Sequence, residues 1–159
     1  MPKVMLIGYG NPLRTDDAIG WRAAGELSAQ LTGDDVEIVA CHQLNPEMAE
    51  ALAQADLVIF IDACTDGTPG RVSRREVQPA AFSPELMSHH LDPESLLACA
   101  KELYGHAPKA VVICVTGECF GFGRELTPTV ERVLPGVLEL ARGLMQKAAP
   151  KAKAAKMVQ

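Results

Sequence analysis

The stretch KVMLIGYGNPLRTDDAIG, residues 3–20, decides how the chain begins to fold. Its apolar run at residues 4–7 is typical of a strand buried on both faces of a parallel sheet. Residues 8–12 are rich in glycine and end in proline, so the backbone bends sharply there. Apolar residues then recur at helical spacing over residues 19–31. The stretch therefore predicts a strand, a glycine turn and an amphipathic helix.

Two carboxylates, Asp16 and Asp17, stand where this helix is expected to start. A strand, a Gly-x-Gly turn and a helix also open dinucleotide-binding folds, but the third glycine of that fingerprint is Leu13 here. A diphosphate binds at a helix N-terminus, where these two acids would repel it. Helix capping explains one acid. The pair favours a site for something positively charged.

The rest of the chain continues to alternate between predicted strands and helices. We expect a strand at 36–40, buried strands at 56–62 and 109–116, an edge strand at 71–77, and helices at 46–55, 92–104 and 127–144. Pro135 predicts a kink or a late start in the last helix. The fold expected is a single α/β domain over residues 1–147, a mostly parallel, twisted sheet of about five strands with helices on both faces. Residues 148–159, rich in lysine and alanine, are expected to form a flexible tail.

Composition narrows the class of protein. The 159 residues carry a formal net charge of -5 with acids and bases interleaved, so neither nucleic acid nor an anionic membrane surface is an expected partner. No apolar segment is long enough to cross a bilayer and no signal peptide is visible, which predicts a cytoplasmic protein. The five cysteines are odd in number and include no CxxC pair, so disulfides are not expected. Cys64 and Cys119 alone lie at strand ends, where a thiol could serve a site.

The opening motif resembles a known family. Residues 8–20, GYGNPLRTDDAIG, are similar to the first motif of the hydrogenase maturation endopeptidases, which trim the C-terminal extension from the large subunit of nickel-iron hydrogenases. The later landmarks follow in the family's order: an apolar strand ending in Asp62, a proline-glycine loop, a histidine before a helix, and the sequence LTPTVE at residues 126–131. HQLNPE at residues 42–47 departs from the family, because many members carry an aspartate and a glycine-rich turn there.

The resemblance implies the site residues. It places metal ligands at Asp17, where the family often has glutamate, at Asp62, and at His89, and the same three residues are the expected catalytic group. Of the two adjacent histidines, His89 has the family's spacing to Leu91 and to the next helix. His90 is then a neighbour that can contact substrate.

This ligand set bounds the chemistry. One imidazole and two carboxylates suit nickel, zinc or manganese and leave coordination positions open. HExxH and Gly-x-Ser-x-Gly motifs are absent, and no cysteine has the setting of a thiol protease. Two mechanisms fit: the three residues grip nickel already carried by the substrate, or the enzyme holds its own metal to activate water. The first is favoured because it makes cleavage depend on metal loading.

The resemblance also implies a partner, the nickel-containing precursor of a hydrogenase large subunit, on which a small enzyme can act as a monomer. Two alternatives stay open. The missing aspartate near His42 leaves room for a non-catalytic nickel-binding or chaperone-like module for hydrogenase assembly. A nucleotide-binding domain comes third.

Overall fold

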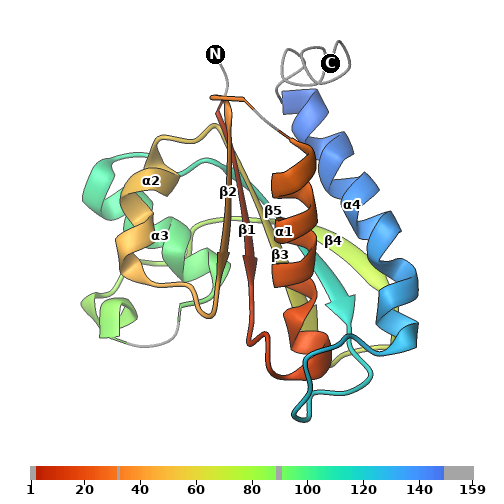
Figure 1. Ribbon diagram of the computed structural model, residues 1–159. Coiled ribbons are helices and arrows are strands. Elements are labelled where there is room, and N and C mark those ends of the chain that lie inside the picture. The colour runs from red at the N-terminus through yellow and green to blue at the C-terminus, as the bar shows by residue number, and fades with distance from the viewer. Residues whose placement is uncertain (1–2, 32, 89–90, 149–159) are drawn as a thin grey trace.

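The computed structural model describes residues 3–31, 33–88 and 91–148. Strands and helices alternate through most of it, as the sequence predicts (Figure 1). The strands are β1 (Val4–Tyr9), β2 (Val36–Cys41), β3 (Leu57–Cys64), β4 (Val72–Val77) and β5 (Lys109–Thr116). The helices are α1 (Ile19–Gln30), α2 (Ala49–Ala53), α3 (Pro93–Tyr104) and α4 (Pro128–Ala148). Three short 3-10 turns complete the list: η1 (Thr15–Ala18), η2 (Pro46–Met48) and η3 (Pro84–Ser88).

The five strands form one sheet in the order β2-β1-β3-β5-β4. All neighbouring pairs are parallel except β4 and β5, which are antiparallel. This confirms a mostly parallel sheet, and the place of β4 at one end of the strand order confirms the predicted edge strand. β3 runs two residues past Asp62, to Cys64, whereas the sequence predicted that Asp62 would close the strand. The extension is held by pairing with β5, where Cys64 lies opposite Thr116. Apolar patterning could not show it, because residues 62–64 are only half-buried.

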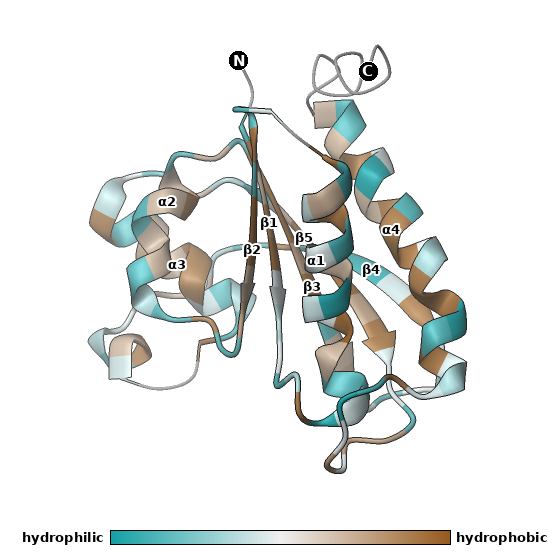
Figure 2. Ribbon diagram, viewed as in Figure 1, coloured by the Kyte–Doolittle hydropathy of each residue, from teal (hydrophilic) through white to brown (hydrophobic). Residues whose placement is uncertain are grey.

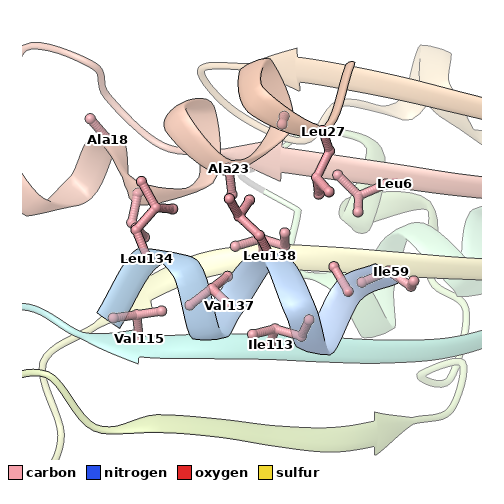
Figure 3. Packing of buried hydrophobic residues seen from close by; sticks show 14 of the residues in the cluster. Leu6, Ala18, Ala23, Leu27, Ile59, Ile113, Val115, Leu134, Val137 and Leu138 are labelled. Carbon is pink, nitrogen blue, oxygen red and sulfur yellow. The ribbon is translucent and has the colours of Figure 1, made fainter. Parts of the chain in front are cut away.

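Two helical layers cover the sheet. Helices α1 and α4 pack on one face, α2 and α3 on the other, so both faces of β1 and β3 are buried (Figures 1 and 2). Successive strand residues therefore serve opposite cores: Ile59 and Ile61 face α1 and α4, and Phe60 faces α2 and α3. Figure 3 shows the first core, where leucines of α1 and α4 meet the strand side chains. This confirms the predicted α/β class.

Helix α4 is continuous through Pro135. It begins at Pro128, so the predicted late start is wrong. Apolar residues at helical spacing, from Val130 to Met145, are buried against the sheet and α1. This packing offsets the backbone hydrogen bond that an internal proline removes. The helix ends the described part of the chain, in which no helix has the length and apolarity to span a membrane.

Two glycines let β1 and α1 touch. A Cβ atom added at Gly8 would lie 1.9 Å from the carbonyl oxygen of Gly20. A Cβ atom at Gly20 would lie 2.5 Å from the carbonyl oxygen of Ile61 and 2.6 Å from the backbone nitrogen of Tyr9. These backbone atoms belong to the ends of β1 and β3. Gly20 therefore sets how closely the start of α1 approaches the carboxyl edge of the sheet.

Replacing Gly20 by alanine is expected to lower the free energy of unfolding by about 2–3 kcal/mol, because the added methyl group would overlap backbone that cannot rotate away. Urea unfolding monitored by circular dichroism measures the change. Gly25, on the same helix, is the matched control, since a Cβ atom there meets nothing within 4 Å. Gly25→Ala should be stabilising by up to about 1 kcal/mol through helix propensity. Equal effects at the two positions would contradict the close-contact role of Gly20.

Candidate active site

The glycine turn after β1 fixes Asp17. Gly10 has φ +143, and a Cβ atom there would lie 2.1 Å from the carbonyl oxygen of Asp17, so only glycine fits. The Asn11 N–H donates to Asp17 Oδ2 at 2.7 Å, and the Trp21 indole N–H donates to the Gly10 carbonyl at 2.7 Å. The turn thus folds back onto the carboxylate and holds it half-buried at the edge of the sheet.

Asp62 lies near the carboxyl end of β3 and points to the face covered by α2 and α3, as does Phe60 two residues earlier. Its Oδ1 accepts the N–H of Ala63 at 2.8 Å. Burial raises the pKa of Asp62 to about 6; hydrogen bonding from Tyr9 and Ala63 opposes the rise, and the charge of Asp17 adds to it. The two predicted carboxylates are therefore close enough to interact electrostatically. The turn η1, which carries Asp17, packs against β3.

Tyr9 completes this corner, and the sequence reasoning missed it. Burial raises the pKa of the Tyr9 hydroxyl above its ordinary value, and hydrogen bonding to Asp62 and the charge of that carboxylate raise it further. Its ring packs edge-on against Phe60, with 6.4 Å between ring centroids. The neutral hydroxyl is a donor held toward Asp62. The alternation of side chains along paired parallel strands could have identified Tyr9. Gly8 lies opposite Ile61, so the residues that follow them, Tyr9 and Asp62, point to the same face of the sheet.

The third predicted ligand, His89, lies outside the described residues, as does His90. The described chain resumes just before α3, where Asp92 caps the helix by accepting the Ser95 N–H at 2.8 Å. The charge of Glu94, in the first turn of α3, also raises the pKa of Tyr9. Helix α3 packs on the same face of the sheet as Tyr9.

Asp16 has a different role from its neighbour. Its carboxylate is wholly buried and accepts the N–H groups of Glu118 at 2.7 Å, Cys119 at 3.0 Å and Thr127 at 2.8 Å. The Thr127 hydroxyl also donates to both carboxylate oxygens. Capping of the first helix by one of the two acids is wrong, because neither η1 nor α1 has a side-chain cap. Asp16 instead holds the loop that leads from β5 into α4.

The five cysteines are free thiols. The buried and half-buried ones offer no evident nucleophile. Burial raises the pKa of Cys41 and Cys99, and it raises that of Cys114 to about 12 with a contribution from Cys64. These thiols stay protonated near neutral pH. Cys64 contacts the Thr116 hydroxyl at 3.6 Å.

Two carboxylates of the described residues could bind a cation. Among them no group of three histidine, cysteine, aspartate or glutamate side chains could hold a metal ion. Asp17 and Asp62 provide two carboxylates with lone pairs left after the hydrogen bonds from Asn11 and Ala63. Oxygen donors of this kind fit a divalent cation.

Comparisons with known proteins connect this fold and site to a family. No family model matches the chain. It is 30% identical over 142 residues to the hydrogenase 2 maturation protease of Escherichia coli K12, covering 86% of this chain and 87% of the relative. The hydrogenase-maturating endopeptidase HybD from E. coli superposes with a TM-score of 0.75 at 25% identity, over 92% of this chain and 94% of that one.

A second solved structure has the same fold. The NiFe hydrogenase maturation protease HycI of Thermococcus kodakarensis KOD1 gives a TM-score of 0.73 at 24% identity, over 91% of this chain and 92% of that one. The curated relative covers nearly the whole domain, so a non-catalytic module is no longer the simplest account of the chain. The chain belongs to the hydrogenase maturation protease family and is a peptidase.

Proposed function

We propose that this peptidase removes the C-terminal extension of a nickel-iron hydrogenase large-subunit precursor after nickel insertion, and that Asp17, Asp62 and His89 recognise the metal. The observation that carries the proposal is the pair of carboxylates at the carboxyl edge of the sheet, close enough for the charge of Asp17 to raise the pKa of Asp62. Parallel α/β sheets bind their ligands at this edge. We further propose that the reaction takes place in the cytoplasm and that the enzyme acts as a monomer.

A cation is the partner that such a pair lacks. Within the described ranges, none of the Lys or Arg ion pairs involves Asp17 or Asp62. Two like charges facing each other in a half-buried corner repel, and a divalent cation between them would remove that repulsion. Carboxylate oxygens with one imidazole suit nickel, and other divalent metals such as zinc or manganese share these preferences.

The remaining ligand is proposed from sequence spacing and from the position of α3. His89 lies three residues before Asp92, the cap of this helix. Helix α3 packs on the face of the sheet that Tyr9 also occupies. We propose that His89, in the segment that leads into α3, is this ligand.

Recognition of nickel carried by the substrate explains selectivity for one bond in one protein. The metal would bring the scissile peptide to a fixed position, so proximity would supply much of the rate. Tyr9 and the Ala63 N–H hold the Asp62 carboxylate in place for this contact. If the enzyme keeps a metal of its own, that metal supplies a bound water of lowered pKa as nucleophile.

Nickel loading of the precursor is expected to decide whether it is cut. Purified precursor, with and without nickel, is incubated with the protein and its intact mass is followed. We expect loss of a C-terminal peptide from the loaded form alone. The control is the Asp17→Asn variant, which keeps the size of the Asp17 side chain but removes the charge that we propose recognises nickel. Equal cleavage of both forms would favour an enzyme-held metal, and cleavage of neither would contradict the proposed substrate.

A further inference from the structure

An aromatic side chain projects from the loop between β5 and α4. Phe122 is 82% exposed, although a phenyl ring in water is unfavourable. The guanidinium of Arg14 lies 4.5 Å from the centre of this ring. Leu13, the next residue back, is 47% exposed. Leu13, Arg14 and Phe122 form an apolar surface with one positive charge, which we call the docking rim.

The rim is held rigidly from two segments that lie far apart in the sequence. The Thr15 N–H donates to the Gly123 carbonyl at 3.0 Å, and the Gly123 N–H donates to the Leu13 carbonyl at 3.0 Å. The Thr15 hydroxyl donates to the Gly121 carbonyl at 2.7 Å. Thr15 has φ 52, a left-handed conformation that a β-branched residue rarely adopts. Strain of this kind persists where the surrounding contacts fix a functional shape.

The rim is continuous with the carboxylate site. Asp17 follows Arg14 by one turn, and its N–H donates to the Arg14 carbonyl at 3.0 Å. Asp16, between them, binds the same loop that carries Phe122. In Figure 1 the loop after β5 lies beside the start of α1, at the end of the sheet where β1 ends. A protein whose peptide bond reaches Asp17 and Asp62 would therefore also reach the rim.

We propose that the docking rim binds the folded surface of the substrate precursor beside its cleavage point. This inference rests on the proposed function. The surface that fits is an apolar patch with a carboxylate at its edge, because the rim offers a ring and a leucine side chain beside one guanidinium. Aromatic and arginine side chains are the usual anchors of protein interfaces. A rim fixed in advance loses little conformational freedom on binding.

Steady-state cleavage of the precursor tests the rim. Phe122→Ala is expected to raise KM by about tenfold or more and to leave kcat close to that of the wild type. Arg14→Ala should raise KM and weaken its dependence on salt. Tyr104→Ala is the matched control, because Tyr104 is 50% exposed at the far end of α3, and its KM should not change. An unchanged KM in Phe122→Ala, with an unchanged melting temperature, would overturn the proposal.

Binding measured without cleavage separates this inference from the proposed function. The Asp62→Asn variant is titrated with the precursor, alone and combined with Phe122→Ala. Weaker binding by the double variant supports the rim even if the wild type leaves the precursor uncut, in which case only the proposed function fails. Equal binding by both overturns the rim. Sedimentation tests whether a second copy of the chain occupies the rim instead. If the wild type is a dimer, and Phe122→Ala makes it a monomer without changing KM, the rim is a dimer interface and the proposal is overturned.

Discussion

Asp62→Asn is expected to lower the rate of precursor cleavage by about a hundredfold or more while the protein stays folded. The carboxylate lies at the carboxyl edge of the sheet beside Asp17, and the amide keeps its shape but not its charge. Asp62→Ala should abolish processing as well. The intact-mass assay with nickel-loaded precursor measures both. Full processing by a folded Asp62 variant would contradict the assignment of this residue to the site.

The same substitution is expected to stabilise the metal-free protein at high pH. Burial raises the pKa of Asp62 from its ordinary value of 3.8 to about 6 in the folded state, so the folded state binds the proton more tightly than the unfolded state does. The stability that this proton contributes is fully present below the lower value and is lost as pH rises through the higher one. Above about pH 6 the buried carboxylate is ionised at a cost that asparagine avoids.

We therefore expect Asp62→Asn to be more stable than the wild type by about 1–2 kcal/mol near pH 8, after allowing for partial solvent exposure, and the difference to shrink toward about pH 4. Urea unfolding in the presence of a chelator, at several pH values, gives the comparison. A pH-independent difference would show that burial of this carboxylate is not its cause. If Asp62→Asn loses activity and gains stability, the charge of Asp62 is retained for function at a cost in stability.

Local sequence patterns were sufficient for much of the fold. Continuous apolar runs identified β1 and β3, and alternation with charged residues identified β4 as an edge strand, because burial on one or two faces determines these patterns. Asp62 could be placed at a strand end because a charge rarely interrupts a buried strand. The resemblance supplied its role, which the position alone did not give.

The interactions missed by the sequence reasoning join residues far apart in the chain. Asp16 and Asp17 have the same side chain and adjacent positions, yet one is buried against a loop and the other faces the site. The partners of Asp16 lie more than 100 residues away, at separations of 102 and 103 for Glu118 and Cys119. The groups of Glu118 and Cys119 that bind Asp16 are backbone N–H groups, which carry no side-chain signal. The glycines after β5 predicted a loop, but not where the loop would lie.

Asp16→Ala is expected to lower the free energy of unfolding by about 4 kcal/mol or more. The substitution removes every acceptor that the carboxylate offers to the backbone N–H groups of Glu118, Cys119 and Thr127. A hydrogen bond to a charged acceptor contributes more free energy than one between neutral groups, so its loss costs more. Because Asp16 is wholly buried, water cannot easily take the place of the lost carboxylate. Asp34→Ala, at an exposed acid, is the control and should change stability by less than about 0.5 kcal/mol.

Loosening this clamp should also impair substrate binding, because Asp16 connects the segment that carries Asp17 to the loop that carries Phe122. Below its melting temperature, the Asp16→Asn variant is expected to have a raised KM for the precursor. The amide has one acceptor oxygen where the carboxylate has two, and its NH₂ group would face the remaining backbone N–H donors. Hydrogen exchange of the amides of Glu118 and Cys119 should accelerate in the same variant, while the β3 amides stay protected. Unchanged exchange in the loop, with unchanged KM, would mean that other contacts hold the loop and that Asp16 is dispensable to it.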